Sequence, residues 1–165
     1  MNKTILGNTE FVEISGRKGK KIPAKIDTGA DSSAIWASKI RVDKDGTLKF
    51  ALFGEGSEFY NGKIFKRTDF SVVKVRSTTG HEQIRYRVPF SVIIGGKVIN
   101  MKMNLSDRSG NIFPILIGRT SLSGEFIVDP SIEKVKIERK KNRLNRNMKI
   151  SPYEFYKKYI KGAEK

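Results

Sequence analysis

The chain has 165 residues, the usual length of a single domain. Hydrophobic residues make up 38% of it and charged residues 30%, which excludes a disordered chain and an integral membrane protein. No run approaches the roughly 20 apolar residues of a membrane-spanning helix, and residues 1–7 predict no signal peptide, so we expect a cytoplasmic protein with no membrane role. The absence of cysteine and the single histidine exclude disulfides, thiolate catalysis and a histidine-rich zinc site.

The net charge is strongly positive and unevenly distributed. Lysine and arginine number 33 against 17 acidic residues, a formal charge of +16. Residues 139–165 hold ten basic and two acidic residues, so half of the excess lies in a short C-terminal segment. Such a chain is expected to attract anions such as nucleic acid or acidic polypeptides.

Three segments alternate apolar and polar residues, as half-buried strands do. In chain order, their apolar positions are Ile22, Ala24 and Ile26; Leu48, Phe50 and Leu52; and Ile99, Met101, Met103 and Leu105. Turn residues separate the strands at 16–19, 44–46, 54–56, 79–80 and 95–96. Many short strands with closely spaced turns predict an all-β fold, either a small barrel or a sandwich.

The C-terminal segment has a different character. Residues 139–149 contain six basic residues and no acidic residue, as solvated linkers do. Ser151, Pro152 and Glu154 then form a capping box, which predicts a short amphipathic helix at about 152–161. We therefore expect a main domain at 1–138 and a basic tail with a short helix at 139–165.

Two segments each run from an apolar strand into a glycine turn. Residues 26–33 read Ile-Asp-Thr-Gly-Ala-Asp-Ser-Ser, and residues 114–119 read Pro-Ile-Leu-Ile-Gly-Arg. A carboxylate directly after a buried strand, such as Asp27, is costly to ionise unless it has a partner or a use. An ordinary turn would also employ Asp as a cap and Gly at positive φ, so the Asp-Thr-Gly tripeptide alone supports both interpretations.

Taken together, the two segments resemble the signature of the retropepsin-like aspartic proteases, in which apolar-Asp-Thr-Gly-Ala-Asp is followed later by apolar residues, Gly and Arg. Residues 84–87 look like an arm of the family's flap, and 92–97 look like the strand and turn that follow it. The flap tip would be Thr78, Thr79, Gly80 and His81. The resemblance covers about residues 9–135 and implies a single-lobe, closed β-barrel with a flap hairpin.

A bacterial and archaeal branch of these proteases, often labelled ATP-dependent zinc protease and found with ATP-grasp glutamate ligases, is more similar still. Its motifs match residues 25–30, 78–80, 105–108 and 113–119, although Trp36 stands where the branch usually has a histidine. The zinc label finds no support in a chain with one histidine, and no GxxxxGK[ST] loop is present for ATP. We expect no metal and no cofactor, and we assign any ATP dependence to a partner ligase.

The resemblance implies catalysis by Asp27, Thr28 and Gly29. Aspartic proteolysis needs two carboxylates that share one proton, one acting as base to a water and the other as acid to the scissile carbonyl. Because this chain holds one Asp-Thr-Gly, the second must come from another copy, so we expect a homodimer. Thr28 would hydrogen-bond across the two-fold axis, and Gly29 would let the backbone approach the carboxylate.

The family pattern also implies supporting residues. Asp31 and Arg119 would form a buried or interfacial ion pair, and losing one partner of a buried pair costs about 3–5 kcal/mol. From their residue types, Asp107 and Arg108 are expected to form a local ion pair and Trp36 to pack in the core or an interface. The match of Asp107 and Arg108 to the branch motif implies a role toward substrate as the alternative. His81 is expected to be an exposed turn residue. Substrate subsites would comprise Ala34, Thr78, Thr79, Gly80, Pro114 and Leu116. Ordinary core packing is the other interpretation of Ala34, Pro114 and Leu116.

The basic charge suggests the substrate. A positive cleft would raise the rate and affinity for an acidic peptide. Four arginines are candidate contacts, at positions Arg76, Arg85, Arg87 and Arg108. With the association with glutamate ligases, they predict an endopeptidase for acidic or glutamate-rich peptides or poly-glutamate tails. The other interpretation is that basic residues only keep the surface solvated.

Two further functions stay open at this point. The basic residues of 139–149, with Phe155, Tyr156 and Tyr159, would suit nucleic-acid binding, which is not favoured because no RNP, KH or zinc-finger signature is present. A non-catalytic retropepsin-like binding module that kept the dimer and lost turnover would have the same sequence pattern.

Overall fold

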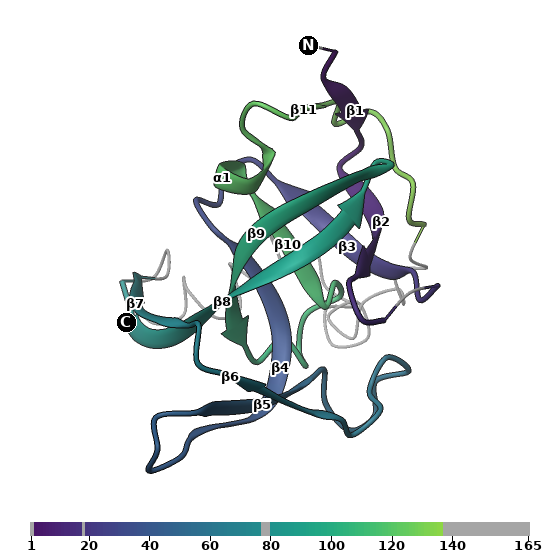
Figure 1. Cartoon of the computed structure of the whole chain (residues 1–165). Coiled ribbons are helices and arrows are strands. Elements are labelled where there is room, and N and C mark those ends of the chain that lie inside the picture. The colour runs from purple at the N-terminus through teal and green to yellow at the C-terminus, as the bar shows by residue number, and fades with distance from the viewer. Residues whose placement is uncertain (1, 18, 77–79, 137–165) are drawn as a thin grey trace, which may run out of the picture. The chain divides into compact units, whose positions relative to one another are not determined.

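The computed structural model describes residues 2–17, 19–76 and 80–136 (Figure 1). Of these, all residues up to Val135 belong to one compact unit. The linker and helix predicted within 139–165 lie outside the described residues, as do Thr78 and Thr79. Within the described ranges, no helix is long and apolar enough to cross a membrane.

The described residues form eleven strands and one short helix, which confirms the all-β prediction. The strands are β1 Thr4–Leu6, β2 Thr9–Ile14, β3 Ile22–Asp27, β4 Ser33–Val42, β5 Leu48–Leu52, β6 Ile64–Arg67, β7 Ser71–Arg76, β8 Glu82–Ile94, β9 Lys97–Ser106, β10 Ile115–Gly118 and β11 Phe126–Val128. The helix, α1 Arg119–Leu122, follows β10 directly.

Nine strands belong to one sheet that closes on itself. Its order is β10-β3-β2-β8-β9-β4-β5-β6, with β7 paired to β8. Because β10 pairs with β4 as well as with β3, the strands β10, β3, β2, β8, β9 and β4 form a ring (Figure 1). β1 and β11 make a separate, parallel two-stranded sheet.

The predicted alternation places the core inside the ring. Ile22, Ala24 and Ile26 of β3 are at most 5% exposed, whereas Lys25 between them is exposed. The same pattern buries Met101 of β9, together with Met103 and Leu105. Each large apolar side chain contributes about 1.5–3 kcal/mol on burial, so this packing holds β3 and β9 in the ring.

Two hairpins form the flap and the wall behind it. β8 and β9 are joined by Gly95 and Gly96, whose φ angles of 57° and 78° suit a two-residue turn of type I′. β7 pairs with the first half of β8, from Ser71 opposite Arg87 to Arg76 opposite Glu82. The flap arms expected from the sequence are therefore paired strands.

Candidate active site

The Asp-Thr-Gly segment forms a tight loop at the end of β3. The backbone N–H groups of Gly29 and Ala30 lie 3.1 Å and 3.3 Å from Asp27 Oδ1, to which they donate hydrogen bonds. A Cβ at position 29 would stand 3.3 Å from the same oxygen, so glycine gives the backbone close access to the carboxylate. Asp27 is half-buried, whereas Thr28 is exposed. The loop thus holds one carboxylate oxygen by backbone donors.

The second glycine motif lies directly against this loop. β10 runs parallel to β3, with Gly118 opposite Asp27. Gly118 N donates to Ser33 Oγ at 3.0 Å, and Arg119 N donates to Ala30 O at 2.8 Å. A Cβ on Gly118 would stand 2.6 Å from the carbonyl carbon of Ser32, a contact that backbone atoms cannot relieve cheaply. The two motifs, which are far apart in sequence, therefore form one unit.

Asp31 and Arg119 form the expected ion pair, but it is not buried in the single chain. Arg119 Nη2 contacts Asp31 Oδ1, and the two side chains are 61% and 76% exposed. Solvent screens such a pair, so it contributes about 1 kcal/mol or less to the stability of one chain, below the value for a buried pair.

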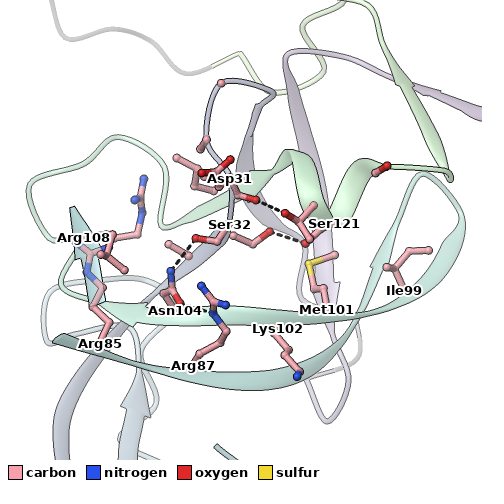
Figure 2. Close-up of a pocket in the computed structure, with 18 of the residues that line it drawn as sticks. Asp31, Ser32, Arg85, Arg87, Ile99, Met101, Lys102, Asn104, Arg108 and Ser121 are labelled. Carbon is pink, nitrogen blue, oxygen red and sulfur yellow. Dashed lines mark hydrogen bonds between the residues drawn. The ribbon is translucent and has the colours of Figure 1, made fainter. Parts of the chain in front are cut away.

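A cleft of about 1410 Å³ lies beside the loop (Figure 2). Residues 29–34, the flap strands β7 and β8, and β9 contribute to its walls. Of the subsite residues expected from the sequence, Ala34 and Leu116 line the cleft. Pro114 does not: it is buried, and its carbonyl oxygen accepts a hydrogen bond from Trp36 N at 2.8 Å. Gly80 is exposed at the flap end and is not part of the lining.

The cleft lining is strongly cationic. Its acidic residues, Asp31 and Glu125, are each paired with a cation outside the lining, the second with Lys97 at 3.2 Å. Its basic residues are Lys74, Arg76, Arg85, Arg87, Lys102 and Arg108. In Figure 2, Arg85, Arg87 and Arg108 gather on one side, away from Ile99.

These three, here called the cleft arginines, are each held by a neutral oxygen. Arg85 donates to Gln83 Oε1, at 3.0 Å from Nη2. Arg87 Nε donates to Asn104 Oδ1 at 2.9 Å, and Arg108 Nε donates to the Phe113 carbonyl at 3.0 Å. Among the described residues, no carboxylate lies within salt-bridge distance of a cleft arginine. Their charges are therefore oriented without being neutralised.

Arg108 lies within electrostatic reach of the loop. Its pKa is lowered, mainly by burial and further by Arg85, whereas Asp27 acts in the opposite direction. A guanidinium keeps its charge despite such a shift. The ion pair expected between Arg108 and Asp107 is wrong: Asp107 Oδ1 instead accepts from Ser109 N at 2.9 Å, in a turn. Arg108 thus faces the cleft.

Two kinds of residue were missed at the sequence level. Ser33 is fully buried and bonds Ser121 Oγ at 2.8 Å, which fastens α1 to the loop. Asn104 is 2% exposed and joins Arg87 to Ser32. The turn at 95–96 could have predicted the contact between Arg87 and Asn104, because the strand register that pairs Ile94 with Lys97 also brings Arg87 opposite Asn104.

A ring of strands in which an Asp-Thr-Gly loop lies against an Ile-Leu-Ile-Gly-Arg segment, beside a flap hairpin, defines a retropepsin-like fold and site. Residues 5–139 match the RimB-like family, described as the retropepsin-like aspartic endopeptidase RimB. The chain belongs to this family.

Individual relatives agree with the family assignment. The chain is 29% identical over 133 residues to a probable alpha-L-glutamate ligase of Shewanella pealeana, and 28% identical to one of Shewanella halifaxensis. Each match covers 79% of this chain and 29% of the relative, so the chain spans less than a third of their length. It also resembles the crystal structure of a Legionella pneumophila protein of unknown function, with a TM-score of 0.60 and 26% identity over 79% of this chain and 96% of the other.

Proposed function

We propose that the protein is an aspartic endopeptidase that works as a homodimer and cleaves acidic or glutamate-rich peptides. The observation that carries this proposal is the position of Asp27. Its carboxylate is held by two backbone N–H groups in a loop that borders a large cleft. Both donors bind Oδ1. In the proposed site, the other oxygen of Asp27 binds a water or faces the second carboxylate.

In the proposed reaction, the two Asp27 side chains of the dimer share one proton. Two carboxylates about 3 Å apart do not both ionise, so one is a base and the other an acid. The ionised Asp27 takes a proton from water, whose oxygen attacks the peptide carbonyl carbon. The protonated Asp27 gives its proton to the carbonyl oxygen. As the diol collapses and the C–N bond breaks, the Asp27 that took the water proton gives it to the amine nitrogen. The other Asp27 takes a proton from a diol hydroxyl, so the pair again holds one proton.

The charge of the cleft supports an acidic substrate. The cleft arginines have no carboxylate partner among the described residues, and Arg108 is half-buried next to Arg85. Like charges in a partly desolvated site repel, and a bound carboxylate would relieve this repulsion. Substrate glutamates are therefore expected to bind more tightly than glutamines of the same shape.

The relatives point to a related biological context. Proteins named probable alpha-L-glutamate ligases contain a region similar to this chain within a much longer sequence. We propose that this chain acts with a ligase of that kind, either on the same polypeptide or as a separate partner. Its substrates would then include poly-glutamate tails.

The decisive variant is Asp27→Asn in the full chain. Asparagine keeps the shape of the loop and its acceptor oxygen but removes the acid and the base. We expect hydrolysis of glutamate-rich peptides, followed by mass spectrometry, to fall at least about 10³-fold. The dimer should persist, because the variant removes repulsion between two carboxylates.

Asp107→Asn is the matched control. Asp107 is an exposed carboxylate outside the cleft lining, and asparagine can still accept the hydrogen bond from Ser109 N. This variant should retain hydrolysis. Retained hydrolysis in Asp27→Asn would refute the proposed reaction, and a wild-type chain that binds peptides without cleaving them would favour a non-catalytic module.

A further inference from the structure

One buried amide connects the flap strand with the catalytic loop. Asn104 of β9 lies opposite Arg87 of β8 on one side and opposite Ala34 of β4 on the other. Its Oδ1 accepts from Arg87 Nε at 2.9 Å, and its Nδ2 donates to Ser32 Oγ at 3.0 Å (Figure 2). At 2% exposure it has almost no access to solvent, so these two bonds satisfy groups that water cannot reach.

The residue type at this position has an electrostatic consequence. An apolar side chain would leave Arg87 without its acceptor, and the guanidinium would be free to change direction. A carboxylate would hold Arg87 more strongly but would cancel its charge. An amide orients the guanidinium and leaves the positive charge available. Asn104 uses one of the five guanidinium N–H groups, and in the described part of the chain no other hydrogen bond to this guanidinium is present, so the remaining groups can serve a ligand in the cleft.

We propose that Asn104 is a positioning residue that determines specificity: it directs Arg87 into the cleft beside the catalytic loop while preserving its charge for a substrate carboxylate. The inference rests on the proposed acidic substrate. The inference can be tested separately from the proteolytic reaction, because it predicts the affinity for the substrate and not the cleavage of a bond.

Binding is measured in the full-length, cleavage-inactive Asp27→Asn protein with tetraglutamate as the probe. Adding Asn104→Asp should weaken tetraglutamate binding about tenfold, because the new carboxylate competes with the ligand for Arg87. Asn104→Ala should weaken binding less, because the charge of Arg87 remains although its direction is lost. Binding of tetraglutamine should be unchanged in Asn104→Asp, because the amide probe has no charge to lose.

Two controls separate this role from a structural one. Ser32 Oγ can donate to an aspartate at position 104, so Asn104→Asp should keep the melting temperature of its parent. In the active chain, the same variant should raise KM for a glutamate-rich peptide while leaving kcat within about twofold, since Asn104 does not touch the reacting atoms.

The outcomes are distinguishable from those that test the protease. Equal tetraglutamate affinity in parent and Asn104→Asp, or no binding of tetraglutamate by the parent, overturns the role of Asn104. Equal losses for tetraglutamate and tetraglutamine also overturn it, since they indicate a damaged cleft. A charge-specific effect of Asn104→Asp in a protein without Asp27-dependent hydrolysis supports the role and refutes the proposed reaction instead.

Discussion

The cations at the end of the flap and the cleft arginines differ in their partners. Lys74 and Arg76, near the end of β7, both contact Glu82, at 2.5 Å and 2.7 Å. The cleft arginines instead donate to a side-chain amide or a backbone carbonyl. All five cations border the same cleft.

The difference separates two functions of a basic residue. A carboxylate partner offsets the charge of a cation. At the flap end, Lys74 and Arg76 are 65% and 72% exposed, so replacing their contacts with water by contacts with Glu82 changes the free energy little. A neutral oxygen fixes direction without removing charge, and the cleft arginines are half-buried, where an uncompensated charge acts more strongly. Net charge alone therefore does not locate an anion site. The site is located by the basic side chains whose hydrogen-bond acceptors are neutral.

Among changes to the cations of the cleft, replacing a cleft arginine should have the largest effect. Arg108→Gln can keep the bond to the Phe113 carbonyl while removing the charge near Asp27. We expect kcat/KM for a glutamate-rich peptide to fall about 30-fold. Arg76→Gln is the matched control, because Arg76 is largely exposed and shares the carboxylate of Glu82 with Lys74, and it should cost about twofold. Equal losses in the two variants would remove the distinction between the two groups of cations.

The salt concentration should also reveal the uncompensated charge of the cleft arginines, with a smaller effect on kcat/KM. Raising the salt concentration from about 0.05 M to about 0.5 M should lower kcat/KM for a glutamate-rich peptide about fivefold, because ions screen the cleft arginines. A glutamine-rich peptide should be nearly unaffected, and Arg108→Gln should flatten the salt dependence. A salt effect that is the same for both peptides would indicate a general influence on the protein.

Releasing the flap-end cations should slightly improve binding. Glu82→Gln frees Lys74 and Arg76, so tetraglutamate should bind about twofold more tightly near neutral pH. The pKa of Glu82 is lowered, first by Lys74 and then by Arg76. The contacts of Glu82 are therefore complete above the ordinary carboxylate pKa and are lost as pH falls through the lowered value. Acid should loosen the flap strands in wild type more than in the variant, as hydrogen exchange would reveal.

The smallest effect is expected at Arg119. This residue has a carboxylate partner, Asp31, and both are well exposed in the single chain. Arg119→Met should reduce the free energy of unfolding by about 1 kcal/mol or less in urea titrations of dilute protein. A loss of about 3 kcal/mol that depends on protein concentration would instead place the pair in an interface between chains.

The sequence predicted local features better than it predicted partners. The alternation of apolar and polar residues is a short-range pattern, and it located β3, β5 and β9 correctly. The Asp-Thr-Gly and Ile-Gly-Arg motifs could be connected only through the family resemblance, yet β3 and β10 do lie side by side. The exposure of the Asp31 pair and the position of Pro114 could not be predicted, because both depend on how the ring closes.

The hydrogen-bond partners of the cleft arginines are also difficult to predict from the sequence. Gln83 and Phe113 have no recognisable motif, and Asn104 is one polar residue in an alternating strand. Its partner follows from strand register, which the turn at 95–96 sets, but its burial follows from the packing of β9 between β8 and β4. Long-range packing decides which polar residues meet, so sequence patterns alone underpredict such networks.

The most direct test of the account measures whether one active site needs Asp27 from two chains. Wild-type and Asp27→Asn chains are coexpressed in equal amounts, and the three kinds of dimer are purified together without separation. Their hydrolysis is compared with that of the same amount of wild type alone. If both chains contribute a carboxylate, only the dimers with two wild-type chains are active, about a quarter of the total for random pairing. Activity at about half of the wild-type value would contradict the account, because each chain would then work alone.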